Sequence, residues 1–226
     1  MPEAVRRRYG EEYLAYETER QLEYRAIALR SLSECGLRPD APPSPGARLL
    51  EVGCATGALL SSFSDGGWEV TGVEVGESMA EYGRRRWNLD VRSGTLEEAG
   101  FGAGSFDTAV ATHLIEHLNE PRAFLAELRR VLRPGAPLFL ITPNADSLQA
   151  VLMGSRWRSA IRDHLYLFSR RTLDAMLAAE GFRTERVLTW GGWPAGMRPR
   201  ALKRPLDGLA KLAGIGDVMA VRARVR

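Results

Sequence analysis

The 226-residue chain is predicted to be an α/β protein with a mostly parallel sheet that carries an antiparallel strand at one edge. Two patterns support this prediction. From residue 47 onward, short apolar runs alternate with helical stretches, which is typical of strand–helix–strand units. Near its end the chain instead shows a strand, a long excursion and a last strand with period-two alternation, which favours antiparallel pairing at one edge of the sheet.

The pattern predicts seven strands and the helices between them. The strands are expected at residues 48–52, 68–74, 89–92, 106–112, 137–142, 183–190 and 217–225, and helices at residues 58–65, 78–86, 121–132 and 170–180. Arg133-Pro-Gly ends the third of these helices directly before a buried strand. An irregular stretch is expected from Pro143 to His164.

The N-terminal part of the chain is expected to be helical. Residues 3–35 consist largely of good helix formers, with tyrosines spaced by four and three residues, so one or two helices with an aromatic face are expected. A proline-rich linker follows at residues 38–46. The predicted organisation is an N-terminal helical arm or lid over residues 1–38 and a main domain over residues 47–226, with substrate-side insertions at residues 143–168 and 191–214, the second of which holds a short amphipathic piece at residues 202–212.

Composition excludes several classes of protein. Hydrophobic residues make up 45% of the chain and charged residues 26%, which is ordinary for a soluble globular domain. No apolar run approaches the roughly 20 residues of a membrane-spanning helix, and the N-terminus lacks the apolar segment of a secretory signal. Two cysteines in dissimilar contexts rule out a disulfide framework. We therefore expect a cytoplasmic protein without an integral membrane segment.

Positive charge gathers in the last third of the chain. Residues 156–226 carry 15 basic and 6 acidic side chains, whereas the preceding residues carry 16 and 22. This excess favours an acidic or lipid-linked small-molecule acceptor, and a solvated basic face explains it equally well. No nucleic-acid-binding motif is evident, so nucleic acid is not expected as a partner. The sequence does not indicate an oligomeric state.

A turn of small residues follows the first strand of the main domain. The segment Leu-Glu-Val-Gly-Cys-Ala-Thr-Gly occupies residues 50–57, where Gly53 and Gly57 permit tight turning and close approach of a ligand. Glu74 ends the next strand and can accept hydrogen bonds from both hydroxyls of a ribose. Alanines replace two glycines of the dinucleotide fingerprint, which disfavours a nicotinamide-dependent dehydrogenase. A nucleoside cofactor with an amino-acid tail is favoured.

These residues resemble the first motif of the class I S-adenosylmethionine-dependent methyltransferases, acid-x-Gly-x-Gly-x-Gly, with Ala55 at the central glycine. The resemblance covers roughly residues 45–226 and implies a Rossmann-like fold with S-adenosylmethionine as cofactor. Among subfamilies, the chain looks most like the O-methyltransferases of ubiquinone biosynthesis. These share His-x-x-Glu-His after strand four and Thr-Pro-Asn after strand five, which here occupy residues 113–117 and 142–144.

The resemblance also implies which residues bind the cofactor. Carried over by position, Glu51, Gly53, Cys54, Ala55 and Gly57 line the methionine part, Glu74 holds the ribose, Val75, Met79, Thr95 and Leu96 enclose the adenine, and Thr112 and His113 close the pocket near the sulfonium.

All three histidines fall in motif segments, at positions 113, 117 and 164. The pattern His-x-x-Glu-His also occurs in inverzincin peptidases, but there it lies on a helix with a further carboxylate ligand. Here it follows an apolar strand and precedes a helix start, so a loop and no metal are expected. In open α/β sheets ligands bind beyond the carboxyl ends of the strands, so the histidines are expected at that rim.

The expected activity is methyl transfer to a small molecule, at oxygen rather than at nitrogen or carbon. An oxygen nucleophile has to lose its proton, and a neutral histidine is suited to accept it. His164 is the first candidate for this base and His117 the second. Equally, His117 is suited to cap the following helix and His164 to anchor its loop. A non-catalytic S-adenosylmethionine-binding module on the same fold is the alternative function.

Overall fold

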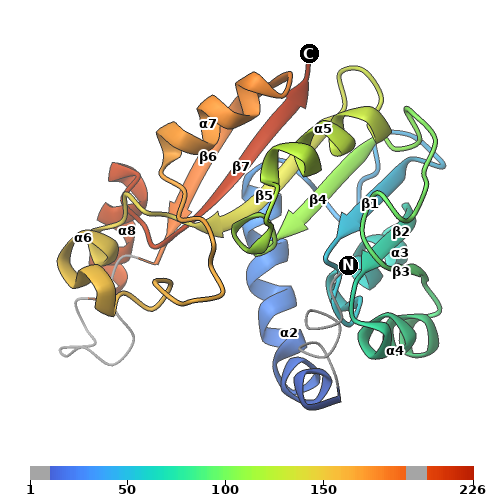
Figure 1. The fold of residues 1–226 in the computed structure, drawn as a ribbon, viewed down its shortest axis with the longest axis horizontal. Helices are drawn as coiled ribbons and strands as arrows, with labels where there is room; N and C mark the ends of the chain where they lie inside the picture. Colours follow the sequence, from blue (N-terminus) through green and yellow to red (C-terminus); the bar gives the residue numbers. More distant parts are fainter. Residues whose placement is uncertain (1–10, 192–202) are drawn as a thin grey trace.

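The computed structural model describes residues 11–191 and 203–226, so the predictions for residues 1–10 and 192–202 lie outside the described part. Its centre is a seven-stranded sheet in the order β3-β2-β1-β4-β5-β7-β6 (Figure 1). The strands are β1 (Arg48–Val52), β2 (Glu69–Glu74), β3 (Asp90–Ser93), β4 (Thr108–Thr112), β5 (Pro137–Pro143), β6 (Phe182–Trp190) and β7 (Val218–Val225).

The pairing confirms the predicted mixed sheet. Strands β1 to β5 pair in parallel, whereas β7 runs antiparallel to β5 on one side and to the edge strand β6 on the other. The predicted strand starting at residue 106 is shorter in the structure, because Phe106 forms only an isolated bridge with Leu132. The carboxyl ends of β1, β2 and β4 therefore meet at one edge.

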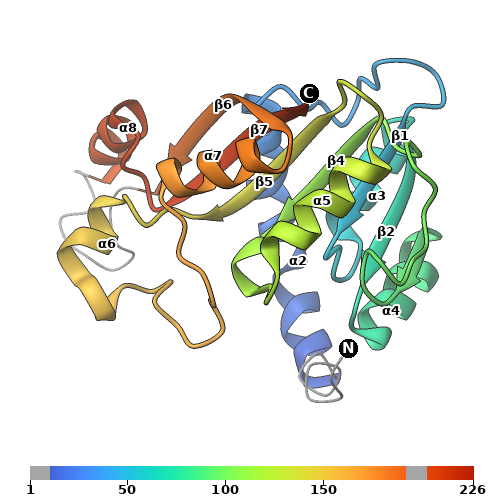
Figure 2. The same cartoon turned by 45° about the horizontal axis from the view of Figure 1, so that its top comes forward.

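Helices cover both faces of the sheet (Figures 1 and 2). One face carries α2 (Glu11–Glu34), α3 (Ala58–Asp65) and α4 (Glu77–Trp87), and the other carries α5 (Pro121–Val131) and α7 (Arg170–Ala179). The helix α8 (Lys203–Ala213), at the predicted amphipathic piece, contacts β6 and is joined to α2 by an ion pair between Lys211 and Glu34.

Alternation along the strands creates the two apolar layers. In β5, Leu138 and Leu140 pack under α5 and α7, whereas Phe139 and Ile141 pack against the layer that includes α3. Each of these four side chains is at most 2% exposed. The central strands are buried on both faces, and this explains why they appear in the sequence as continuous apolar runs.

In its described part, from residue 11 to residue 38, the N-terminal arm contains one long helix, α2. Leu32 near the end of α2 is buried with the α3 layer, and Gln21 Nε2 donates to the Tyr82 hydroxyl of α4 at 3.2 Å. The helix α2 therefore contacts α3 and α4 of the main domain. Its action as a lid remains a prediction.

The prediction of an irregular stretch after β5 was partly wrong. Residues 143–164 contain α6 (Leu148–Met153) and the 3-10 turn η2 (Gly154–Arg156). Ser147 caps the start of α6, because its hydroxyl accepts the Ala150 N–H at 3.0 Å. Among the described residues, no helix combines the length and the apolar character needed to cross a bilayer.

Candidate functional site

The predicted cofactor turn lies at the carboxyl edge of the sheet, between β1 and α3. Its backbone is left-handed at three positions, with φ of 71° at Gly53, 47° at Ala55 and 75° at Gly57. A Cβ added to Gly53 would lie 3.2 Å from Leu114, and one added to Gly57 would lie 2.9 Å from Leu89. Both glycines are thus required by conformation and by close packing.

Replacing Ala55 with glycine is expected to raise the free energy of unfolding. A left-handed backbone costs an alanine about 1 kcal/mol or more, and glycine avoids this cost at some expense in chain entropy. We expect a net gain of up to about 1 kcal/mol, measured by urea unfolding, with cofactor affinity unchanged within about twofold. Ala58→Gly is the matched control. This variant should be less stable than the wild type, because Ala58 lies in α3 and glycine is a poor helix former. A less stable Ala55→Gly variant would contradict the inference that the backbone of Ala55 is strained.

Glu74 is held by the backbone of the cofactor turn and of the next loop. Its Oε2 accepts the Ala55 N–H at 2.9 Å and its Oε1 accepts the Gly76 N–H at 2.8 Å. Burial raises the pKa of this carboxyl, while these hydrogen bonds oppose the rise and the negative charge of Glu17 on α2 adds to it. A carboxylate has about four lone-pair sites, so Glu74 retains acceptor capacity for two ribose hydroxyls.

Glu51 provides the test of fit for the amino-acid tail of the cofactor. The residue is 2% exposed, and its Oε2 has no hydrogen-bond partner among the described residues. Burial, followed by the charge of Glu74, raises its pKa well above the ordinary value. An unpaired buried carboxylate is costly, and a cationic ammonium group stabilises it. The orphaned oxygen therefore fits the methionine end of S-adenosylmethionine.

The remaining predicted cofactor residues differ in how accessible they are. Val75, Thr95 and Thr112 are half-buried, whereas Cys54, Met79 and Leu96 are buried, at 4%, 1% and 2% exposure. The side chains of Cys54, Met79 and Leu96 thus present little surface to a ligand. They would contribute to an adenosine pocket by shaping its wall and through their backbone atoms. Their cofactor roles remain proposals.

The His-x-x-Glu-His segment forms the loop after β4, as predicted, with a 3-10 turn, η1 (Ile115–His117). His113 has φ of 51° and donates its backbone N–H to the Ile141 carbonyl at 2.8 Å. Its Nδ1 lies 3.2 Å from Glu116 Oε1, and the Thr142 hydroxyl donates to Glu116 Oε2 at 3.0 Å. A non-glycine residue in this conformation is strained, and such strain gathers at functional sites.

The segment before α7 folds back onto this loop. His117 Nδ1 lies 2.8 Å from the Asp163 carbonyl oxygen, and the Tyr166 N–H donates to the Glu116 carbonyl at 3.1 Å. His164 Nδ1 lies 2.8 Å from the Ser159 carbonyl oxygen, and its ring centroid is 4.7 Å from that of His117. The structure thus places His164 beside His117, and it shows His164 anchored to its own loop.

Charge in this cluster favours an ionised carboxylate beside a neutral ring. Burial lowers the pKa of His164, the negative charge of Glu116 opposes this, and His117 adds to it. Burial alone would raise the pKa of Glu116, but the hydrogen bond and charge of His113, with the charge of His117, bring it below the ordinary value. Ligand atoms of Glu116, His117 and His164 all lie within 4.8 Å of one another, so these residues form a candidate metal-binding group.

Asp217, which was not predicted as a site residue, fixes the segment that carries His164. Asp217 is 1% exposed, accepts the Trp157 Nε1–H at 2.5 Å and forms an ion pair with Arg158. Ser159, whose carbonyl positions His164, comes next in the chain. The sequence signal that could have pointed to Asp217 was its position as an acidic residue directly before an apolar strand.

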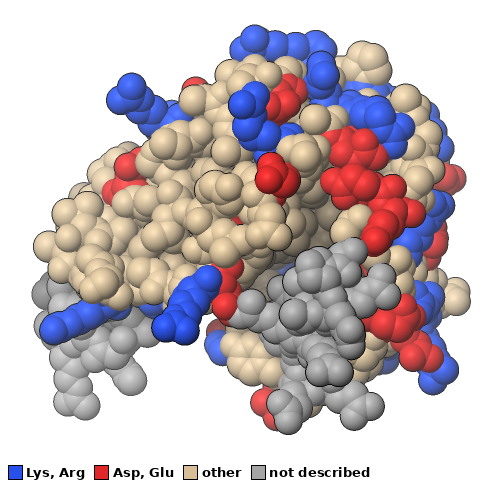
Figure 3. Space-filling model, in the orientation of Figure 1, with Lys and Arg blue, Asp and Glu red and all other residues tan. Residues whose placement is uncertain are grey.

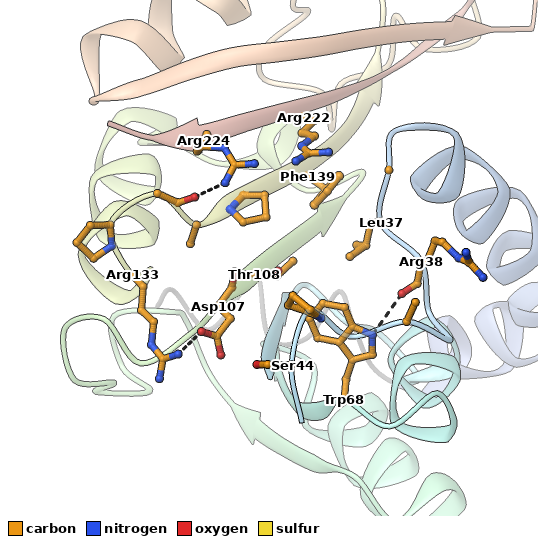
Figure 4. Close-up of a pocket in the computed structure, with 17 residues that line it drawn as sticks. Leu37, Arg38, Ser44, Trp68, Asp107, Thr108, Arg133, Phe139, Arg222 and Arg224 are labelled. Atoms are coloured by element: carbon orange, nitrogen blue, oxygen red, sulfur yellow. Dashed lines mark hydrogen bonds and ion pairs between the residues drawn. The ribbon is translucent and has the colours of Figure 1, made fainter. Parts of the chain in front are cut away.

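A separate cavity of about 480 Å³ lies at the opposite, amino-terminal edge of the parallel strands (Figure 4). Arginine side chains surround it, and several are already engaged: Arg133 pairs with Asp107, and Arg224 Nη1 donates to the Gly135 carbonyl at 2.5 Å. This cavity shares none of its lining residues with the cofactor turn or the histidine loop, so it is not part of the candidate site.

The strand order, the glycine turn after β1 and the acid that ends β2 define a class I S-adenosylmethionine-dependent methyltransferase domain. Residues 16–187 match the model of a family described as "Methyltransferase domain", and the chain belongs to this family. Its cofactor is S-adenosylmethionine.

Curated relatives agree with this assignment. The chain is 37% identical over 108 residues to a ubiquinone biosynthesis O-methyltransferase from Hahella chejuensis, covering 45% of each protein. It is 36% identical over 156 residues to an O-methyltransferase from Pyrenophora dematioidea, covering 62% of this chain and 56% of that one. The matches thus span about half the length of these relatives.

A likeness in fold extends over nearly the whole chain. The crystal structure of a methyltransferase from Thermotoga maritima, described as a possible histamine N-methyltransferase, has a TM-score of 0.68 at 22% identity. The alignment covers 95% of this chain and 98% of that one. At this identity the match supports the fold alone.

Proposed function

We propose that the chain transfers a methyl group from S-adenosylmethionine to a hydroxyl oxygen of a small molecule. The observation that carries this proposal is the cluster of Glu116, His117 and His164, which lies at the same strand edge as the cofactor turn. Relatives named O-methyltransferases support oxygen as the acceptor atom. When bound, the cofactor supplies an electrophilic methyl group on a sulfonium.

In this proposal, Glu51 and Glu74 bind the two ends of the cofactor, and the histidines act on the acceptor. A carbonyl oxygen only accepts hydrogen bonds, so His164 Nδ1 carries the hydrogen toward Ser159 and the lone pair lies on Nε2. His164 is therefore the first candidate to take the hydroxyl proton directly, and His117, with the same tautomer, is the second.

The surface around α6 supports an acceptor with an apolar or lipid-linked part. Large apolar side chains are exposed on α6 and on the segment before α7: Leu148, Val151, Leu152, Met153, Ile161, Leu165, Tyr166 and Leu167. Figure 3 shows that the region over α6 has few charged residues, with basic ones along its lower border. In contrast, Arg222 and Arg224 both pair with Glu185, so part of the basic excess is engaged within the protein.

Turnover by a His164→Ala variant tests the proposal. The full chain is incubated with S-adenosylmethionine and a panel of hydroxylated aromatic compounds with and without an isoprenoid tail, and S-adenosylhomocysteine is measured by chromatography. We expect the variant to lose about 100-fold or more in kcat while it retains cofactor affinity. Tyr166→Phe, in the same segment, is the control and should retain turnover, because it removes only a hydrogen bond to the Asn119 carbonyl.

Two results would count against the proposal. Full turnover by His164→Ala would remove that residue from the reaction. Saturable cofactor binding without methyl transfer to any acceptor, including those in a cell extract, would favour the alternative of a non-catalytic binding module.

A further inference from the structure

The cavity of about 480 Å³ at the amino-terminal edge of the parallel strands plays no part in the proposed methyl transfer. It lies where β4 and β5 begin, between the residues that follow α2 and the last residues of β7 (Figure 4). Its volume is within the range of about 300–1,000 Å³ that is typical of small-molecule sites. The lining combines apolar side chains with guanidinium groups, and each of these suits a different part of a ligand.

Positive charge exceeds negative charge in the lining of this cavity. Among the described residues that line it, the acidic one is Asp107, and the basic ones are Arg38, Arg133, Arg222 and Arg224. Asp107 pairs with Arg133, and Arg38 pairs with Asp40 in the linker. The excess therefore lies on Arg222 and Arg224 of β7.

Arg222 and Arg224 share one carboxylate. Both contact Glu185 of the edge strand β6, with N–O distances of 2.9 and 2.7 Å, and Arg183 lies 3.3 Å from the same carboxylate. The hydrogen bond from Arg224, helped by the charges of the three arginines, outweighs burial and holds the pKa of Glu185 below its ordinary value. One carboxylate thus faces three guanidinium groups, so positive charge remains uncompensated beside the cavity.

The guanidinium group of Arg222 has unused hydrogen-bonding capacity. Its Nε is buried and, despite the short distance to Glu185, has no hydrogen-bond acceptor among the described residues. Its Cζ lies 5.8 Å from the centre of the Phe139 ring. Gly36 has φ of 93°, and a Cβ there would lie 2.8 Å from Arg222 Nη1, so this glycine leaves room for the group. Phosphate oxygens suit such a guanidinium group, because its N–H groups form a planar fork.

The apolar part of the lining is well packed. Leu37, Trp68 and Phe139 are 4%, 5% and 2% exposed. The Trp68 Nε1–H donates to the Arg38 carbonyl at 3.3 Å, which fixes the indole ring in the wall. Figure 4 shows the labelled arginines around these apolar side chains. Sites for small organic ligands have this composition, in which apolar walls enclose the ligand and a few polar groups fix its orientation.

We propose that this cavity binds a phosphate monoester whose remaining part is apolar. The phosphate group contacts Arg222 and Arg224, and the apolar part packs on Trp68 and Phe139. A phosphate monoester carries a charge of about −1.5 to −2 at neutral pH, which matches the uncompensated charge of the arginines. The cavity lies at the opposite edge of the sheet from the cofactor turn, so this ligand and the cofactor bind at the same time.

Calorimetry on the full chain tests the proposal, with phenyl phosphate, inorganic phosphate, benzoate and phenol as probes. We expect one phenyl phosphate per chain, with a Kd of about 1 mM or lower. Inorganic phosphate and benzoate should each bind about 10-fold more weakly, and phenol should show no saturable binding. Saturating S-adenosylhomocysteine should leave the affinity for phenyl phosphate unchanged within about twofold, because the cavity shares no lining residue with the cofactor turn.

Two variants locate the bound phenyl phosphate. Arg222→Gln removes a guanidinium group, and Ser44→Glu adds negative charge at an exposed position of the lining. Each should weaken binding by about 10-fold or more. The matched controls are Arg122→Gln, on the surface of α5, and Ser155→Glu, in η2, and both should retain the affinity within about twofold. Circular dichroism shows whether each variant is folded, and Ser44→Glu remains informative if Arg222→Gln fails to fold.

Several results would overturn the proposal. They are the absence of saturable phenyl phosphate binding, its displacement by S-adenosylhomocysteine, and an affinity that folded Arg222→Gln and Ser44→Glu both retain. Equal affinities for phenyl phosphate and phenol would exclude a role for the arginines, and equal affinities for phenyl phosphate and inorganic phosphate would exclude a role for the apolar wall. Tighter binding of benzoate would exclude a phosphate as the preferred group. Since methyl transfer is not measured, each result is independent of the proposed function.

Discussion

A Glu74→Gln variant is expected to bind S-adenosylmethionine about 100-fold more weakly than the wild type. Two charge-assisted hydrogen bonds to ribose hydroxyls are worth about 1.5 kcal/mol or more each, and a loss of about 3 kcal/mol corresponds to roughly 100-fold in affinity. The amide also meets a donor, because both oxygens of Glu74 accept backbone N–H groups, from Ala55 and from Gly76. An NH2 group at either position would lack an acceptor. Calorimetry with S-adenosylhomocysteine measures the effect.

The control for this variant is Glu81→Gln, which removes the same charge from an exposed side of α4. It should leave the affinity within about twofold, because a surface ion pair contributes little. An affinity of Glu74→Gln within about threefold of the wild type, at an unchanged melting temperature, would contradict hydrogen bonds between the ribose and this carboxylate.

Most of the fold was predictable because its signals are local. The bounds predicted for β1 and α3 agree with the structure, since an apolar run ends in a small-residue turn that starts a helix. The helix α6 was not predicted, although Ser147 offers a cap. Its residues Val151 and Leu152 are 74% and 75% exposed, so α6 has no apolar face that packs into the core and no clear helical periodicity.

The candidate site also has a part that the sequence predicts and a part that it does not. The turn around Gly53 and the acid at Glu74 lie in one strand–helix–strand unit. Within such a unit the spacing of residues along the chain predicts which of them lie close together. The meeting of His117 with His164 depends on the conformation of a segment that has no periodicity. That segment is positioned by single long-range hydrogen bonds, such as Tyr166 N–H to the Glu116 carbonyl. No residue pattern predicts such contacts.

An Asp217→Asn variant is expected to lose about 10-fold or more in kcat with cofactor affinity unchanged within about twofold. The carboxylate accepts from the Trp157 indole and pairs with Arg158, and the neighbouring Ser159 carbonyl orients His164. An amide retains one acceptor oxygen, so one of these contacts is lost. The free energy of unfolding should fall by about 2 kcal/mol, because a buried acceptor of Asp217 is lost. The weakened ion pair adds little to this loss, because the Arg158 side chain is 65% exposed. Asp174→Asn, exposed on α7, is the control.

Asp217 touches neither of the reacting groups in this proposal, so its effect on turnover has to pass through His164. A double-mutant cycle tests that route. If Asp217→Asn acts by displacing His164, the variant that combines it with His164→Ala loses no more kcat than His164→Ala alone. Multiplication of the two losses would instead mean that Asp217 acts by another path, such as a general loosening of β7. In that case Asp217→Asn should also weaken cofactor binding, because β7 pairs with β5 along the centre of the same sheet.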